Sequence, residues 1–117
     1  MQGFLAGESN SLLFAYGQTG TGKTHTMFGP ADSLASPTPH EDWGLLPRIV
    51  SATIEAMKGK TAKLFMSAME FYCWAAWDLN ADKRNLVTVN NDGEVYGHTF
   101  TEIAGPGDIA SFIERVR

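Results

Sequence analysis

The sequence SLLFAYGQTGTGKT, residues 11–24, decides the fold. Residues 11–16 form a short apolar run with large side chains, which is typical of a buried strand in a parallel sheet. The next eight residues, Gly17–Thr24, fit the pattern GxxxxGK[ST]. A helix of one or two turns is expected over residues 23–28, before Gly29-Pro30 ends it. A strand, a glycine-rich loop and a helix in this order predict a phosphate-binding loop in an α/β protein.

Each part of this loop has an expected role. Consecutive backbone N–H groups turn inward around the phosphates, in conformations that favour glycine. The Lys23 ammonium reaches the β and γ phosphates, the Thr24 hydroxyl is a ligand for Mg²⁺, and the start of the helix adds positive potential. We therefore expect a nucleoside triphosphate with Mg²⁺ to bind at Gly17, Gln18, Thr19, Gly20, Thr21, Gly22, Lys23 and Thr24.

Composition limits the class of protein. The 117 residues carry 13 acidic and 9 basic side chains, a net charge of −4, and 44% are hydrophobic. This composition is that of an ordinary globular protein, and the length allows one domain at most. No basic tract suited to nucleic acid is present, and no apolar run has the length of a membrane span. The single cysteine, Cys73, and the lack of a signal peptide predict a cytoplasmic location.

The remaining elements follow from apolar periodicity and turn residues. Residues 29–42 predict an exposed, variable loop, and a helix follows from Leu46 to Met57. Residues 64–72 are apolar on both faces and predict an interior strand, while 86–100 predict a hairpin around an Asp-Gly turn. A last helix is expected over 107–117, with Asp108 as its cap. Together these predict helices flanking a central, mostly parallel sheet, with a small β-hairpin.

Three segments in register resemble the kinesin motor domain. Residues 14–27, FAYGQTGTGKTHTM, resemble the family pattern FAYGQTGSGKT followed by an aromatic residue or His and then TM. Gly44–Arg48 is similar to GIIPR, and Ser67–Tyr72 with Asp78-Leu79 is similar to SxxEIYNExxxDLL. The resemblance covers nearly the whole chain, from the phosphate loop to the helix that precedes the first switch segment of the family. It implies a fragment of a phosphate-loop NTPase fold.

The resemblance also implies function. Members of the family couple ATP hydrolysis to movement on microtubules, so the expected cofactors are ATP and Mg²⁺, and the expected location is the microtubule cytoskeleton. By position, His25 would lie beside the adenine, and Lys83 and Arg84 are the candidate contacts to tubulin. Neither nucleic acid nor membrane is expected as a partner.

The sequence departs from the family at two places. Cys73-Trp74 stands where the family has Asn-Glu, and we expect a buried thiol and packing roles for Trp74 and Trp77. The hairpin loop is Asn90-Asn91-Asp92-Gly93-Glu94, whereas the family carries basic side chains there, suited to acidic tubulin. Scattered His25, His40 and His98 have no zinc-ligand spacing.

The catalytic segments of the family are not among these residues. Its switch motifs NxxSSRSH and DxxGSE, and its adenine-flanking RxRP, have no counterpart in residues 1–117. No catalytic residue is therefore assigned, and we expect a fragment that does not hydrolyse ATP by itself. One alternative is a non-catalytic motor-like module that binds tubulin or another subunit. The other, a small phosphate-loop kinase, needs a lid rich in arginine, whereas Arg48, Arg84, Arg115 and Arg117 are dispersed.

Overall fold

The computed structural model describes residues 2–5, 7–36, 38–81 and 85–116. In these ranges the helices are α1 (Gln2–Leu5), α2 (Lys23–Phe28), α3 (Ala31–Leu34), α4 (Leu45–Met57) and α5 (Pro106–Val116). The strands are β1 (Phe65–Met66), β2 (Met69–Tyr72), β3 (Ala75–Asp78), β4 (Asn85–Val89), β5 (Val95–Tyr96) and β6 (Thr101–Glu102). None of the described helices has the length and apolar content needed to cross a bilayer.

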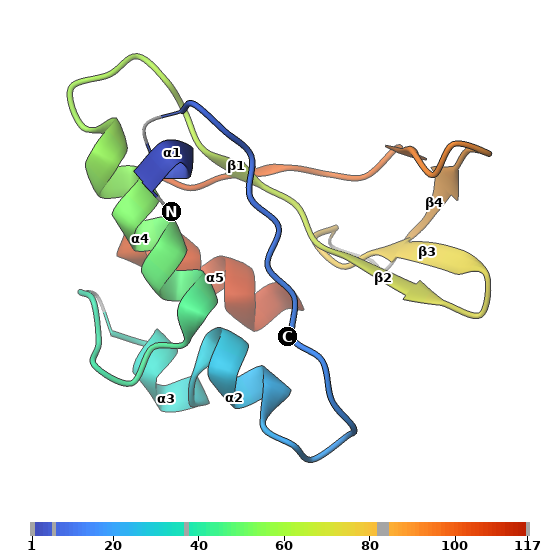
Figure 1. Cartoon of the computed structure of the whole chain (residues 1–117), viewed down its shortest axis with the longest axis horizontal. Helices are drawn as coiled ribbons and strands as arrows, with labels where there is room; N and C mark the ends of the chain where they lie inside the picture. Colours follow the sequence, from blue (N-terminus) through green and yellow to red (C-terminus); the bar gives the residue numbers. More distant parts are fainter. Residues whose placement is uncertain (1, 6, 37, 82–84, 117) are drawn as a thin grey trace.

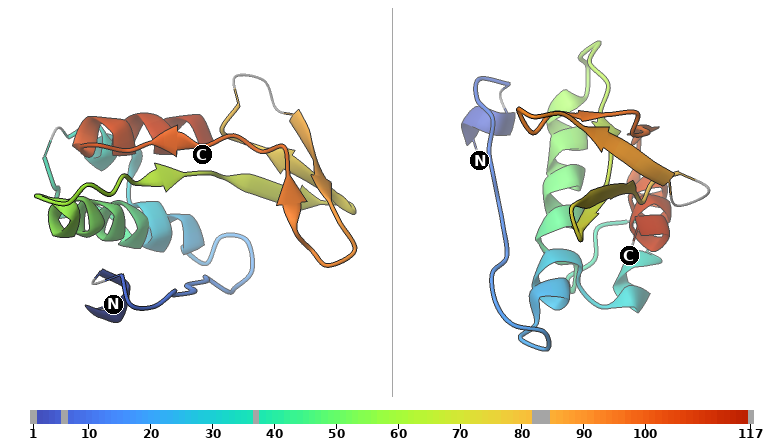
Figure 2. Two further views of the ribbon diagram at one scale, coloured as in Figure 1. Left: turned by 90° about the horizontal axis from the view of Figure 1, so that it is seen from above. Right: turned by 90° about the vertical axis from the view of Figure 1, so that its right-hand side faces the viewer.

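The molecule has two parts, which Figure 1 shows side by side. The helical body consists of α2–α5 with the two-stranded β1–β6 ribbon, and the sheet lobe consists of β2–β5 in the order β2-β3-β4-β5. The sheet lobe projects beyond the helices (Figure 2). Accordingly the Cα radius of gyration is 15.1 Å, whereas a compact domain of this length has about 13 Å.

The core lies in the helical body, where α5 packs across α4. The apolar face of α5 is the expected one, since Ile109, Phe112 and Ile113 are all nearly inaccessible to solvent. They meet Val50 of α4 and the buried Trp43. The indole N–H of Trp43 donates to the carbonyl oxygen of Ser33 at 2.8 Å, so its one polar group is satisfied inside the core.

Helix α4 begins against the end of α2, and Gly44 makes this approach possible. The backbone N–H of Gly44 donates to the carbonyl oxygen of Phe28 at 3.0 Å. A Cβ on Gly44 would lie 2.6 Å from backbone atoms of Met27 and Phe28, closer than any real contact. The Arg48 guanidinium then fastens the segment, since its Nε donates to the carbonyl oxygen of Trp43 at 2.7 Å and its Nη2 donates to that of Glu41. We call the Gly44 and Arg48 contacts together the clamp at Gly44. They hold the end of α2, the helix that follows the phosphate loop.

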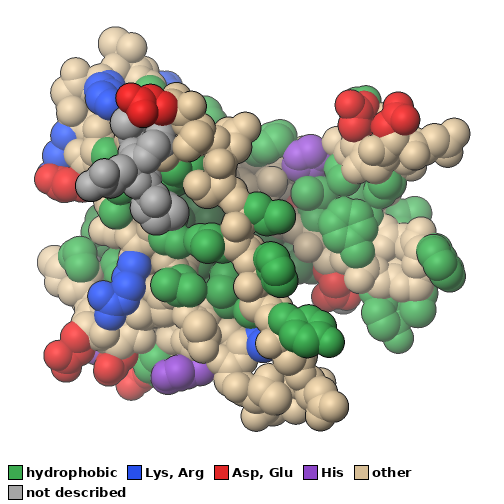
Figure 3. All heavy atoms as spheres, in the orientation of Figure 1, with side chains coloured by type: hydrophobic (Ala, Val, Ile, Leu, Met, Phe, Trp, Pro, Cys, Tyr) green, Lys and Arg blue, Asp and Glu red, His purple; other side chains and the backbone are tan. Residues whose placement is uncertain are grey.

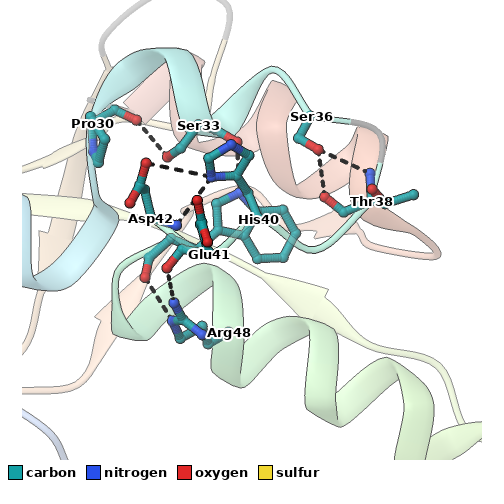
Figure 4. A network of polar contacts seen from close by, with 9 residues as sticks. Pro30, Ser33, Ser36, Thr38, His40, Glu41, Asp42 and Arg48 are labelled. Carbon is teal, nitrogen blue, oxygen red and sulfur yellow. Dashed lines mark hydrogen bonds and ion pairs between the residues drawn. The ribbon is translucent and has the colours of Figure 1, made fainter.

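The loop expected over 29–42 is more ordered than the prediction of a plain exposed loop. It contains α3, in which Ser33 and Leu34 are buried. Figure 4 shows how polar contacts close it: the Ser33 hydroxyl donates to the carbonyl oxygen of Pro30 at 2.7 Å, and the backbone N–H of Asp42 donates to Nδ1 of His40 at 3.1 Å. Leu34 reaches the core because α3 lies against α5, which the sequence pattern of this segment did not reveal.

The described residues do not form the central, mostly parallel sheet that the sequence predicts. Every strand pair among the described residues is antiparallel. Residues 11–16 are extended but form no ladder, and Leu12, Phe14 and Tyr16 are 85%, 81% and 97% exposed. A buried parallel strand needs a neighbour on each side and cover on both faces. The described part of the chain provides neither, because the segment passes along the outside of α4 (Figure 2).

The interior strand expected over 64–72 is also revised. It is divided into β1 and β2 by Ser67-Ala68, and β2 is an edge strand of its sheet, with Phe71 and Tyr72 exposed. β2 and β3 form a hairpin whose two turn residues, Cys73 and Trp74, both have positive φ (49° and 67°). Two-residue hairpin turns require such backbone angles. Cys73 is therefore exposed rather than buried, Trp74 is fully exposed, and only Trp77 is half-buried.

The later elements agree better with the prediction. The hairpin expected over 86–100 exists as β4 and β5, although β5 has only two residues. The last helix begins one residue earlier than expected, at Pro106, a position where proline costs no hydrogen bond. Asp108 is consequently inside the first turn rather than before it, and its carboxylate accepts the backbone N–H of Ala104 at 2.8 Å.

A buried carboxylate joins the sheet lobe to the helical body. Asp78, at the end of β3, is 1% exposed and accepts the backbone N–H of Asn80 at 2.8 Å and both the N–H and the hydroxyl of Thr99, at 2.7 and 2.8 Å. The side-chain oxygen of Asn80 in turn accepts Nη1 of Arg115 on α5, at 3.0 Å. Burial by itself raises the pKa of Asp78, but the Thr99 hydroxyl and nearby backbone N–H groups together outweigh it and lower that pKa.

We expect Asp78→Asn to destabilise the chain by about 1–3 kcal/mol at neutral pH. The amide N–H₂ of asparagine would face the N–H and hydroxyl groups of Asn80 and Thr99, which are themselves donors. A lowered pKa in the folded state means that the ionised carboxylate stabilises the fold above its unfolded pKa of about 3.9 and loses that effect as the pH falls through the folded value. Urea unfolding at neutral pH and at about pH 3 measures both effects. The difference between the variant and the parent chain should shrink in acid, and a constant difference would contradict the role of the charge.

The close approach at Gly44 gives a second expectation. Gly44→Ala forces its methyl group into the backbone of α2, and overpacking of this kind costs about 1–3 kcal/mol. Gly107→Ala is the matched control, because a Cβ there meets nothing within 4 Å and alanine is favoured inside a helix by about 0.5–1 kcal/mol. Thermal unfolding followed by circular dichroism should therefore move in opposite directions for the two variants.

Candidate phosphate-binding site

The loop Gly17–Thr24 links the extended segment 11–16 to α2, at the end of the helical body (Figure 1). It is open to solvent, with all of its residues exposed except the half-buried Lys23. α2 lies beside α4, and the clamp at Gly44 holds its last turn. The helix end of the loop is thus anchored in the core, while the other end continues into an exposed segment.

The glycines of the loop have the backbone angles that the motif predicts. Gly17, Gly20 and Gly22 have φ of 153°, 85° and 92°, in the region that side chains obstruct. A Cβ on Gly17 would also lie 2.7 Å from the Thr21 hydroxyl oxygen. That hydroxyl donates to the carbonyl oxygen of Gln18 at 2.6 Å and closes the turn. The turn therefore depends on glycine at 17 and a small hydroxyl residue at 21.

The Lys23 side chain folds back into the loop. Its Nζ lies 2.5 Å from the carbonyl oxygen of Gly17 and 2.7 Å from that of Gln18. The positive charge is thus held inside the curve of the backbone, at the place where the motif brings an anion. The carbonyl contacts balance the charge of the ammonium and keep the loop closed.

The two residues after Lys23 belong to the first turn of α2. Thr24 and His25 are both exposed, and the backbone of this turn is engaged, since the N–H of Thr26 donates to the carbonyl oxygen of Gly22 at 2.9 Å. The Thr24 hydroxyl and the Lys23 ammonium thus lie on consecutive residues at the same end of the helix. The position of His25 beside an adenine stays a prediction.

The residues expected to hold ATP and Mg²⁺ carry the types of chemical group that these two ligands need. A polyphosphate needs convergent backbone N–H groups and a cation, and the glycine conformations and the Lys23 ammonium are of that type. Magnesium takes oxygen ligands and keeps several waters, so a single exposed hydroxyl such as that of Thr24 suits it. By contrast, the candidate tubulin contacts Lys83 and Arg84 lie outside the described residues.

One group of surface residues was not expected from the sequence. The sheet lobe exposes large apolar side chains, of which Trp74 is the most exposed at 107%. The signal that would have revealed it is the position of Cys73-Trp74 between two pairing strands, since the two residues at the tip of a tight hairpin are seldom covered. Packing roles for both Trp74 and Trp77, as the sequence predicts, leave no such exposed surface.

Comparison with known proteins gives a consistent result. The family model of the kinesin motor domain matches residues 1–117. Kinesin-like protein KIN-12F of Arabidopsis thaliana is 39% identical over 120 aligned residues, covering 86% of this chain and 11% of that protein. Kinesin-like protein KIN-12B of Oryza sativa subsp. japonica is 41% identical over 64 residues, covering 55% of this chain and 6% of that protein. The chain therefore spans only a small part of the length of these relatives.

The contacts of Lys23 lead to a test that needs no ligand. In Lys23→Met the carbonyl groups of Gly17 and Gln18 lose their ammonium partner, so the loop should open more often. Hydrogen exchange should then be faster at the backbone N–H of Thr21, which donates to the carbonyl oxygen of Gln18 at 3.3 Å, with a change in global stability of no more than about 0.5 kcal/mol. Lys58→Met, which removes an exposed ion pair with Glu55, is the matched control. Equal exchange in both variants would mean that Lys23 does not close the loop.

Proposed function

Because the chain belongs to the kinesin motor domain family, a family of ATP-binding microtubule motors, we propose that residues 17–24 bind the phosphates of ATP with Mg²⁺ as the nucleotide-binding segment of such a motor. The observation that carries this proposal is the Lys23 ammonium, which lies 2.5 and 2.7 Å from two carbonyl oxygens of the loop. An incoming phosphate offers this ammonium a stronger partner than the carbonyl groups, because both groups of the new pair are charged.

In this proposal each residue of the site has one task. Backbone N–H groups of Gly17, Gln18, Thr19, Gly20, Thr21 and Gly22 bind phosphate oxygens, and Lys23 neutralises part of their charge. Thr24 offers its hydroxyl to Mg²⁺, which supplies further neutralisation of the phosphate charge when bound. His25 lies beside the adenine. The small-molecule kinase considered from the motif alone has no support from the family.

The extended segment 11–16 has a place in the same proposal. In a complete motor domain we expect it to be a strand of the central, mostly parallel sheet, with further strands on both sides. The supporting observations are its extended backbone without a ladder and its exposed Leu12, Phe14 and Tyr16. Pairing would bury these side chains and would hold the start of the phosphate loop as firmly as the core holds its end.

Hydrolysis and movement belong to the whole motor in this proposal. Positioning of the attacking water and sensing of the γ phosphate need further groups, and the motifs NxxSSRSH and DxxGSE are not among the 117 residues. We therefore propose that this chain alone binds nucleotide without steady turnover. Lys83 and Arg84 remain the proposed contacts to microtubules.

A second candidate function is a module that binds a partner without hydrolysing ATP. The lack of both switch motifs in the sequence favours it for the chain as it stands. The two candidates differ in their dependence on nucleotide. Sedimentation of the chain with microtubules that is the same with ATP, ADP and no nucleotide would favour the module.

Nucleotide binding is testable by titration with a fluorescent ATP analogue in the presence of Mg²⁺. Lys23→Ala removes a charge-assisted contact worth about 1.5–3 kcal/mol, so affinity should fall about 10-fold to 100-fold. Thr24→Val should abolish the gain in affinity that Mg²⁺ gives. Thr26→Val, an equally exposed threonine one half-turn further along α2, is the matched control and should bind as the parent chain does.

Two results would contradict the proposal. An unchanged affinity of Lys23→Ala for the ATP analogue would show that the loop does not bind its phosphates. Steady release of inorganic phosphate, stimulated by microtubules, from the 117-residue chain would show that the groups needed for hydrolysis are present in it after all.

A further inference from the structure

Residues 44–48, GLLPR, resemble the family pattern but have no task in the proposed function. The last of them, Arg48, lies in the first turn of α4. Its guanidinium donates through Nε to the carbonyl oxygen of Trp43 at 2.7 Å and through Nη2 to that of Glu41 (Figure 4). Hydrogen bonds from a charged donor are stronger than those from a neutral one. Arg48 therefore holds the backbone of residues 41–43.

Both groups that accept from Arg48 belong to the main chain. The side chains of Glu41 and Asp42 are exposed to solvent. Figure 3 shows acidic side chains at the surface of this end of the helical body, on the lower left. The bonds of Arg48 to carbonyl groups thus fix the path of the backbone, which an ion pair with a mobile carboxylate would not do.

The backbone that Arg48 holds lies directly against the end of α2. A Cβ on Gly29, the residue that follows α2, would lie 2.4 Å from the carbonyl oxygen of Asp42 and 2.9 Å from the backbone nitrogen of Gly44. The same backbone N–H of Gly44 donates to the carbonyl oxygen of Phe28 at 3.0 Å. Any shift of residues 42–44 is therefore passed on to the last turn of α2.

The helix α2 needs this support. It has six residues, none of them buried, and its N-cap Gly22 forms no capping hydrogen bond with its side chain. Helices of this length are not stable by themselves in water. The half-buried apolar residues of α2, Met27 and Phe28, are both in its last turn. The end of α2 is thus its anchored part, and Lys23 and Thr24 at its start depend on that end for their position.

We propose that Arg48 is a positioning residue of the nucleotide site, which keeps Lys23 and Thr24 in place by holding the backbone against which α2 ends. This inference rests on the proposed function of residues 17–24. A site that adopts its binding conformation for a smaller fraction of the time binds more weakly by that fraction. The Trp43 indole and the His40 imidazole also hold this backbone, so loss of Arg48 should weaken nucleotide binding without abolishing it.

Titration of the 117-residue chain with the fluorescent ATP analogue and Mg²⁺ tests this role. Arg48→Met removes both hydrogen bonds, and affinity should fall about 3-fold to 10-fold. Arg48→Lys keeps the charge but lacks the planar fork that reaches two acceptors, so its affinity should lie between those of Arg48→Met and the parent chain. Arg48→Lys also serves as the test variant if Arg48→Met does not fold. Asp78→Asn, which destabilises the chain from the sheet lobe, is the matched control and should bind as the parent does.

Hydrogen exchange gives a second measurement that needs no nucleotide. The backbone N–H of Thr26 donates to the carbonyl oxygen of Gly22 at 2.9 Å, across the first turn of α2. In Arg48→Met this N–H should exchange faster in NMR spectra, because α2 opens locally more often. In Asp78→Asn its exchange should be unchanged. A purely structural role of Arg48 would make the two variants alike once their free energies of unfolding are matched.

The outcomes separate this inference from the proposed function. Exchange at Thr26 that is the same in Arg48→Met and the parent would overturn the inference, and so would an equal loss of affinity in Asp78→Asn. Unchanged affinity in Arg48→Met, together with lowered affinity in Lys23→Ala, would overturn the inference and leave the proposed function standing. A parent chain that does not bind the analogue would contradict the proposed function and this inference with it.

Discussion

Trp43, with its indole buried, organises the helical body, because this one residue connects segments from three places in the sequence. Its N–H is bound by the carbonyl oxygen of Ser33 in α3, and its own carbonyl oxygen binds Arg48 of α4. Its rings lie in the same cluster as Ile109 and Phe112 of α5. The indole N–H therefore joins the burial of Leu34 in holding α3 against the core, and the backbone of the same residue holds Arg48 at the start of α4.

The phosphate loop depends on this core from one side only. Its helix end is anchored, because the backbone N–H of Gly44 donates to the carbonyl oxygen of Phe28 at the end of α2, and Gly29 lies close against the backbone of Asp42 and Gly44. Its other end continues into residues 11–16, which form no strand pair. Preorganised anion sites need both ends fixed, since a loop that moves loses binding energy to ordering. The Lys23 contacts with Gly17 and Gln18 partly compensate, as they span the loop from one end to the other.

Local patterns predicted local structure well. The 3.6-residue periodicity of α4 and α5 and the Asp-Gly turn each depend on neighbours in sequence, and their elements exist within a few residues of the expected bounds. Burial of Leu12 or Phe71 depends on which strands lie beside them, and an apolar run alone contains no such information. The prediction for the tip of the β2–β3 hairpin was wrong for another reason. Cys73 and Trp74 are unusual turn residues, so their composition favoured a buried segment at the place where the backbone turns.

The two parts of the molecule differ in how closely they follow the family. The phosphate loop keeps every position of its motif, and its glycines have the backbone angles that the motif requires. In the sheet lobe the family's Asn-Glu is Cys73-Trp74, and the loop between β4 and β5 is acidic. Hydrogen bonds of Asp78 with Thr99 and of Arg115 with Asn80 tie the lobe to α5. The loop Gly17–Thr24 lies at the end of the helical body and shares no residue with the exposed surface of the lobe, so a change of side chain on that surface removes no group of the loop.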